Sequence, residues 1–148
     1  MNSLLANPAF QTYAVCSSIL VLKMLFSAVY TGSRRQATQG FVNPEDASRF
    51  GTPGAEAGDV ETPAVAHALR IQRNDGENIP LFFAIGLLYV LCGASRFGAF
   101  FFCWSFTLAR IAHTYFYTKQ MQPARAISFF IGALALVAMS LNVLFKAL

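Results

Sequence analysis

Four apolar stretches alternate with polar segments along this chain, and they predict membrane spans at about residues 10–30, 73–92, 97–117 and 126–145. The apolar part of the second span, residues 79–92, is shorter than the ~20 residues that an α-helix needs to cross the hydrocarbon core of a bilayer, so this span is expected to include the polar residues before it. The pattern therefore predicts an all-α integral membrane protein: a four-helix bundle that forms a single domain over residues 1–148.

The second helix is expected to begin well before its apolar part. Thr62 and Pro63 form a typical helix start, with Thr62 as the cap and Pro63 in the first turn. A helix from Pro63 to Cys92 would be ~45 Å long, whereas the hydrocarbon core is only ~30 Å thick. Its first turns are therefore predicted to project into water on one side of the membrane.

Residues 36–61 form the longest polar segment and contain four glycines. This composition predicts a loop on one face of the membrane. Within it, Asn43 and Pro44 are followed by Glu45 and Asp46, which predicts a turn into a short helix with Pro44 at its first position. Elsewhere the first span is predicted to close at Thr31-Gly32-Ser33.

The composition supports the membrane class and excludes several others. Of the 148 residues, 55% are hydrophobic and only 12% are charged, which is typical of an integral membrane protein. The net charge of +4 is scattered, without the basic block that would indicate a nucleic-acid partner. The cysteines and the two histidines, His67 and His113, lack the spacing of metal ligands, so no metal site is expected. The cysteines are predicted to be buried thiols: Cys16, Cys92 and Cys103.

The distribution of lysine and arginine predicts the orientation in the membrane. No basic residue precedes the first apolar stretch, which indicates a retained membrane helix rather than a cleaved signal peptide. The side that carries the first and third loops holds most of the cations, and the opposite side holds only Arg96 and Lys146. By the positive-inside rule, both loops are expected in the cytosol and both termini on the other side. The cations of the cytosolic side are Arg34, Arg35, Arg49, Arg70, Arg73, Lys119 and Arg125.

A polar stripe on the second helix is the leading candidate for a functional site. Arg70, Arg73, Asn74 and Glu77 follow the spacing that places residues on one helix face. Counting ~20 residues back from Cys92 reaches this stripe, so part of it is expected at membrane depth. Charges at that depth are costly unless they face the interior of the bundle and meet partners there.

Lys23 interrupts the first span well inside its predicted limits. Lys23 lies ~10 Å of helix rise before Tyr30, the predicted end of this span. This is a long way for a lysine side chain to reach the membrane–water interface. We therefore predict that Lys23 pairs with a carboxylate of the second helix, either Asp75 or Glu77.

The third span carries a second polar face, formed by Arg110, His113 and Tyr117 at i, i+3 and i+7. Arg125 lies in the first turn of the fourth span, where the helix dipole disfavours a cation and favours an anion. An excess of guanidinium groups indicates an anionic ligand, and a thiolate would qualify next to Arg125. Because a bundle of four such helices is thin, a tripeptide-sized ligand is expected between subunits of an oligomer.

Four motifs resemble the family of membrane-associated proteins in eicosanoid and glutathione metabolism (MAPEG). They occur in order along nearly the whole chain, at Asn43–Asp46, Arg70–Ile79, Ala109–Thr114 and Gln122–Phe130. The resemblance implies a four-helix homotrimer that binds glutathione between subunits on the cytosolic side. The segments 77–79, 85–89 and 122–130 are most similar to microsomal glutathione transferase 1.

The resemblance also implies roles for individual residues. Arg125 would stabilise the glutathione thiolate, Glu77 would accept from the ligand's ammonium group, and the other arginines would hold its carboxylates. Asp46 matches a family loop position near the thiol and is a candidate for catalytic support. The implied glutathione ligands besides Arg125 are Arg35, Arg70, Arg73, Asn74, Glu77, Arg110, His113 and Tyr117.

The resemblance implies a glutathione transferase that acts on an apolar electrophile or a lipid, with lipid hydroperoxide reduction as an accompanying activity. It would lie in the endoplasmic reticulum, or in the inner membrane of a bacterium. A competing hypothesis is a prostaglandin E synthase-like isomerase, but Ala126 and Phe129 replace a serine and a tyrosine of that branch. A non-catalytic lipid-binding member of the family is a third hypothesis. A small anion transporter subunit is a fourth, although the inverted repeats typical of transporters are missing.

Overall fold

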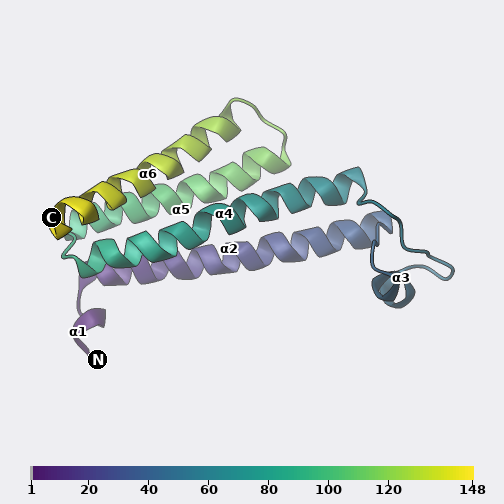
Figure 1. Ribbon diagram of the computed structural model, residues 1–148, viewed down its shortest axis with the longest axis horizontal. Coiled ribbons are helices and arrows are strands. Elements are labelled where there is room, and N and C mark those ends of the chain that lie inside the picture. The colour runs from purple at the N-terminus through teal and green to yellow at the C-terminus, as the bar shows by residue number, and fades with distance from the viewer. Residues whose placement is uncertain (1) are drawn as a thin grey trace. The chain divides into compact units, whose positions relative to one another are not determined.

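The computed structural model describes residues 2–148, and this part of the chain contains helices and no strand (Figure 1). Four helices are long: α2 (Pro8–Thr38), α4 (Pro63–Leu91), α5 (Arg96–Thr118) and α6 (Ala124–Ala147). Two are short: α1 (Asn2–Leu5) and α3 (Pro44–Phe50). The all-α class that the sequence predicts is thus confirmed.

The chain divides into two compact units, which are described separately. Unit 1 consists of Met1–Lys23 and Asp75–Leu148, and unit 2 consists of Met24–Asn74. Unit 1 therefore holds the first part of α2, the second part of α4, and all of α5 and α6. Unit 2 holds the end of α2, the whole of α3 and the beginning of α4.

The four helical segments of unit 1 lie side by side (Figure 1). Aromatic rings fill its core, where Phe82 of α4 stacks on Phe106 of α5 with centroids 4.7 Å apart and Tyr13 of α2 lies 5.8 Å from Phe82. The Tyr13 hydroxyl also donates to the Phe83 carbonyl over 2.9 Å, which ties α2 to α4. Leu20 of α2 and Met139 of α6 are fully buried as well, so every segment contributes to one apolar core.

Unit 2 has its own small core, in which Phe41, Val65 and Ile71 are buried. The helix starts inside it agree with the sequence. Helix α3 begins at Pro44, and α4 begins at Pro63 after Thr62, whose hydroxyl accepts from the Val65 N–H at 3.4 Å. Both predicted proline positions are confirmed. Proline is favourable in a first turn because the backbone N–H that it lacks would have no hydrogen-bond partner inside the helix anyway.

Two sequence predictions about boundaries and burial are wrong. Helix α2 does not close at Thr31-Gly32-Ser33 but continues to Thr38. The hydroxyls of Thr31 and Ser33 donate to the carbonyls of Ser27 and Tyr30 inside the helix, so these residues are accommodated without a turn. Cys16 and Cys103 are buried as predicted, but Cys92 is exposed because it lies just past the end of α4.

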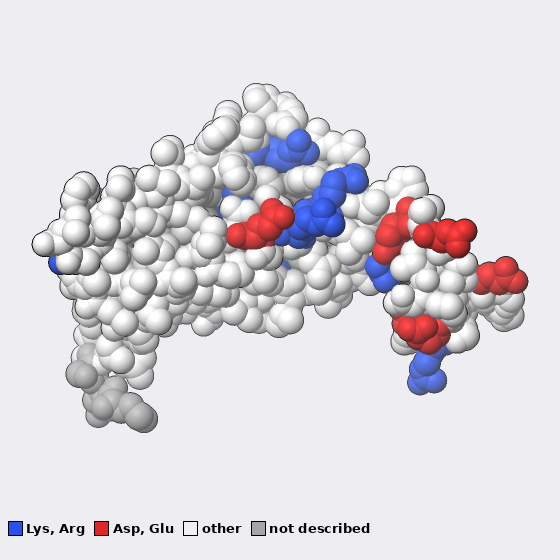
Figure 2. Space-filling view, viewed as in Figure 1, with Lys and Arg blue, Asp and Glu red and all other residues white. Residues whose placement is uncertain are grey.

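The surface separates apolar and acidic regions. Figure 2 shows almost no charged side chain over the end of unit 1 that carries the C-terminus, whereas the acidic side chains of unit 2 gather around α3 and the loop after it. Helices α2 and α6 are long and apolar enough to cross a membrane. The spans within α4 and α5 stay predictions.

Candidate functional site

The polar stripe of the second helix lies on α4. Arg70, Arg73 and Asn74 belong to unit 2, and Glu77 belongs to unit 1. Arg70, Arg73 and Glu77 are exposed in the single chain, and Asn74 is half-buried. The 3.6-residue period keeps all four on one face of this helix, so the stripe presents two guanidinium groups, an amide and a carboxylate.

The polar face of α5 is formed mostly by buried residues. Arg110 is 1% exposed, and its guanidinium lies 5.7 Å from the Phe106 ring centroid and 5.4 Å from that of Phe129. His113 is also buried, with its ring 5.6 Å from Tyr117 and 6.2 Å from Phe129. The two predicted residues Arg110 and His113 therefore converge on the start of α6.

Gly132 of α6 makes room for Arg110. A β-carbon at position 132 would lie 3.3 Å from Nε of Arg110 and 3.4 Å from one of its terminal nitrogens. Such contacts are tighter than usual, so the glycine lets α6 pack closely against the guanidinium. Two aromatic rings and a glycine thus line the guanidinium of Arg110.

Arg125 is the second residue of α6 and contacts Tyr117 near the end of α5. Its guanidinium is 4.6 Å from the Tyr117 ring centroid, a distance that is favourable for a cation–π contact. With the Gln122 amide oriented so that its oxygen faces Arg125, this oxygen accepts from Nη2 at 2.5 Å and from Nε at 3.1 Å. Tyr117 and Gln122 together fix the guanidinium beside the first turn of α6, where backbone N–H groups favour an anion.

Lys23 of α2 pairs with Asp75 of α4, which confirms the predicted pairing and selects Asp75 rather than Glu77. Both side chains are buried, at 9% and 2% exposure. Arg110 and Arg125 belong to unit 1 as well, so its cations outnumber the buried carboxylate of this pair. Such a surplus of positive charge favours an anionic ligand.

Two further predicted residues lie in unit 2. Arg35 at the end of α2 forms an ion pair with Glu61, so part of its bonding capacity is already used. Asp46 lies in the first turn of α3 and accepts from the Asn43 amide at 3.0 Å. This bond links the side chains at the start of α3, and Asp46 is half-buried.

Three residues near the predicted ligands are missed by the sequence analysis: Glu61, Gln122 and Phe129. Glu61 lies 26 positions from Arg35, and only the return of the chain from α3 to α4 brings them together. Phe129 was noted only as the replacement for a tyrosine of the isomerase branch, although it lies four residues after Arg125, a spacing that brings side chains together on a helix. Gln122 precedes α6, and outside a helix the spacing of residues does not indicate where a side chain points.

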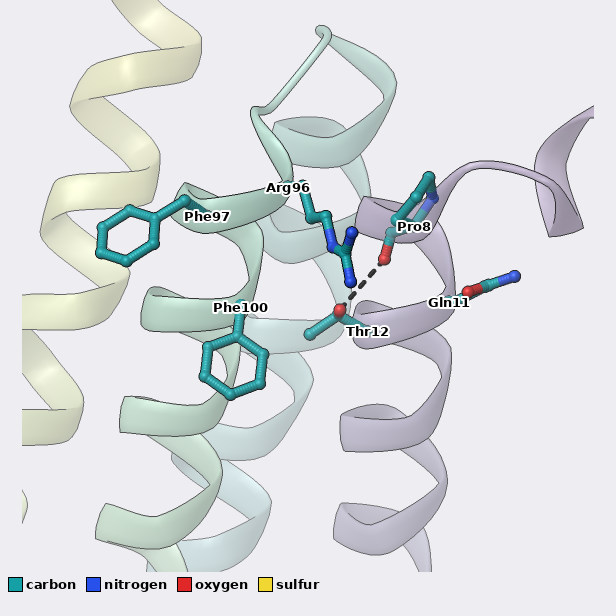
Figure 3. A pocket seen from close by; sticks show the side chains of 6 residues that line it. All are labelled: Pro8, Gln11, Thr12, Arg96, Phe97 and Phe100. Atoms are coloured by element: carbon teal, nitrogen blue, oxygen red, sulfur yellow. Dashed lines mark hydrogen bonds between the residues drawn. The ribbon is translucent and has the colours of Figure 1, made fainter.

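Three open grooves of unit 1 lie away from these residues. One of about 460 Å³ runs between the beginnings of α2 and α5, and its only charged lining residue is Arg96, which reaches toward Thr12 (Figure 3). Two others, of about 450 and 410 Å³, follow the outer faces of α5 and α6 and are lined mainly by apolar residues. None of the three is lined by a predicted ligand residue.

Comparison with known proteins gives two kinds of relative. The sequence model of the MAPEG family matches residues 13–145. Prostaglandin E synthase from Homo sapiens is 35% identical over 144 residues, which is 97% of this chain and 93% of that protein. Microsomal glutathione S-transferase 1 from Sus scrofa is 37% identical over 134 residues, or 89% of this chain and 86% of that protein.

Proposed function

The chain belongs to the MAPEG family, and from this premise we propose that it is a membrane-bound glutathione transferase. It would join the glutathione thiolate to an apolar electrophile, with glutathione as co-substrate. Reduction of lipid hydroperoxides by glutathione is included in the proposal as an accompanying activity. The proposal is supported by the 37% identity to the Sus scrofa relative, which is named as a glutathione S-transferase.

The observation that carries the proposal is the cluster of Arg110, His113, Tyr117 and Arg125 in unit 1. Glutathione has two carboxylates and becomes a further anion when its thiol ionises, so it suits a site with surplus positive charge. Arg125 is fixed by Tyr117 and Gln122 at the start of a helix, the place where a thiolate gains most from backbone N–H groups.

The proposed roles follow from this arrangement. Arg125 stabilises the thiolate, which then attacks the electrophilic carbon of the second substrate and displaces its leaving group. Glu77 accepts hydrogen bonds from the ligand's ammonium group, and Asp46 supports the reaction from the first turn of α3. The residues proposed to hold the rest of glutathione are Arg35, Arg70, Arg73, Asn74, Arg110, His113 and Tyr117.

We also propose that the four long helices form a membrane-spanning bundle and that three chains assemble into a homotrimer. The support is the apolar character of α2 and α6 and the exposed large hydrophobic residues along α5 and α6. The positive-inside rule supports a site that faces the cytosol, in the endoplasmic reticulum or a bacterial inner membrane.

A second candidate activity is the isomerisation carried out by prostaglandin E synthases, since the Homo sapiens enzyme is 35% identical. This chain lacks two hydroxyl groups that are expected from that branch, because Ala126 and Phe129 replace a serine and a tyrosine. The Phe129 ring lies beside both Arg110 and His113, so an apolar edge occupies the place where a hydroxyl would act. We therefore favour the transferase.

Titration calorimetry of the detergent-solubilised protein with glutathione tests the proposal directly, followed by a conjugation assay with a chromogenic aryl halide. Binding in the micromolar to millimolar range with turnover is expected. Arg110→Gln should weaken binding, whereas Arg96→Gln, at the first residue of the same helix, should not. Turnover of a prostaglandin endoperoxide without any conjugation would favour the isomerase, and absence of glutathione binding would refute both activities.

A further inference from the structure

We propose that the groove between the beginnings of α2 and α5 binds one anionic phospholipid, with the phosphate on Arg96 and an acyl chain along α5. The groove has a volume of about 460 Å³ and belongs wholly to unit 1. The proposal rests on the membrane setting given above, but it involves neither glutathione nor the residues proposed to bind it. The lining residues of the groove are Pro8, Gln11, Thr12, Arg96, Phe97 and Phe100.

The guanidinium of Arg96 is available to an anion from outside the chain. Arg96 is exposed, and within residues 2–148 no hydrogen bond or ion pair engages its side chain. No acidic residue precedes Glu45 or follows Glu77 in the sequence. Along α4, Glu77 lies ~21 Å of helix rise from Leu91, the residue with which this helix ends. The acidic side chains of unit 1 are therefore far along α4 from the end at which α5 begins.

Lys146 is the other cation near the end of α4, and it is already used inside the chain. Its ammonium group donates to the carbonyl of Cys92 at 3.0 Å and to the carbonyl of Gly93 at 2.9 Å, just past the end of α4. Lys146 does not line the groove. The two cations therefore differ in the way that a binding site requires, and Lys146 is a natural control for Arg96.

The polar side chains on the α2 side of the groove are engaged in local hydrogen bonds. The hydroxyl of Thr12 donates to the Pro8 carbonyl at 3.0 Å (Figure 3), and the amide of Gln11 donates to the Leu5 carbonyl at 2.6 Å. A phosphate in the groove would thus rely mainly on Arg96. The planar guanidinium suits it, because two parallel N–H groups can donate to two phosphate oxygens.

An apolar track on α5 continues from the groove and favours a lipid over a soluble anion. Phe97 and Phe100 are 78% and 56% exposed, and the Phe100 ring lies 6.4 Å from that of Trp104, one turn further along α5. Leu108, exposed as well, follows at the same spacing of four residues. From Phe97 to Leu108 the helix rises ~17 Å, about half of the ~30 Å hydrocarbon core, which is the depth that one acyl chain fills. A soluble phosphate would use Arg96 and leave this track uncovered.

Trp104 provides the measurement, because it is the single tryptophan of the chain. The detergent-solubilised protein is titrated with phosphatidylglycerol whose acyl chains carry bromine, which quenches tryptophan fluorescence on contact, and with phosphatidylcholine that has the same chains. Phosphatidylglycerol should quench Trp104 saturably and at lower concentration. Arg96→Gln should weaken this binding roughly tenfold, as expected for the loss of a charge-assisted hydrogen bond, and Arg96→Lys should recover part of it. Lys146→Gln should bind like the parent.

Three results would overturn the inference. Equal quenching in the parent and in Arg96→Gln would mean that α5 merely touches surrounding lipid. An equal loss in Arg96→Gln and Lys146→Gln would assign the effect to the general charge of this end. Displacement of the brominated lipid by millimolar glycerol phosphate, which has no acyl chain, would assign the groove to a soluble anion. Arg96→Gln removes no contact within residues 2–148, so it should melt like the parent. Glutathione is absent throughout, so failure here is distinct from failure of the proposed transferase.

Discussion

Replacing Arg125 by alanine should raise the pKa of the bound glutathione thiol back toward its value in water. The structure fixes the guanidinium at the start of α6, 4.6 Å from the Tyr117 ring centroid and bonded to Gln122. A unit charge ~4 Å from the sulfur is worth up to ~4 kcal/mol at an effective dielectric constant of ~20. At 1.36 kcal/mol for each pKa unit, this is a lowering of at most ~3 units.

The expected change in ionisation is large enough to observe directly. A thiol with a pKa of ~8.5 is ~3% ionised at pH 7, whereas one with a pKa of ~6 is ~90% ionised. Arg125→Ala should therefore reduce the bound thiolate, and with it kcat at pH 7, by about thirtyfold. Affinity for glutathione should change far less, because other arginines are proposed to hold the carboxylates.

Ultraviolet absorbance of the thiolate, followed while glutathione is added at neutral pH, measures this without an electrophile. Arg125→Lys should give an intermediate signal, since it keeps the charge but loses the planar contact with Tyr117. Arg49→Ala on α3 is the control and should match the parent. If Arg125→Ala binds glutathione and still ionises it fully, the thiolate is stabilised by another group, and the reasoning from the start of α6 is refuted.

Three further predictions concern the stripe on α4, the packing of Gly132 against Arg110 and the assembly. Glu77→Gln should raise the glutathione dissociation constant or lower the melting temperature, and a variant that binds and melts like the parent would remove the stripe from the site. Gly132→Ala should weaken glutathione binding, and in denaturation experiments it should lower stability by about 1–3 kcal/mol through overpacking against Arg110. As the matched control, Gly32→Ala should stabilise α2 by ~0.5–1 kcal/mol, because a β-carbon at position 32 meets no atom within 4 Å. Native mass spectrometry should give a trimer, and an active monomer or dimer would contradict the assembly.

The sequence alone determined the helices and the class of protein, because both depend on local information. Apolar stretches of fixed length and proline at a helix start need no tertiary contact to be recognised, and α3 and α4 begin at Pro44 and Pro63 as expected. The end of α2 was misjudged for the opposite reason. A Thr-Gly-Ser sequence favours a turn only weakly, and hydroxyl bonds to preceding carbonyls keep it helical.

The sequence also showed that Lys23 needs an acidic partner, since an isolated charge at that depth is too costly. It could not choose between Asp75 and Glu77. These positions are ~200° apart around α4, so only one of them can face α2, and the packing of unit 1 turns Asp75 inward. Glu77 is left exposed on the opposite side, with the rest of the polar stripe.

The surroundings of the predicted ligands were decided by tertiary structure alone. Helical period identifies which residues share a face, but not which helix that face meets or which side chain fills the space between. Thus Arg110 and His113 were found from their spacing, whereas the Phe129 ring beside them, the gap at Gly132 and the ion pair of Arg35 with Glu61 follow from how distant segments pack. Those contacts depend on the three-dimensional approach of the backbone, which no local pattern encodes.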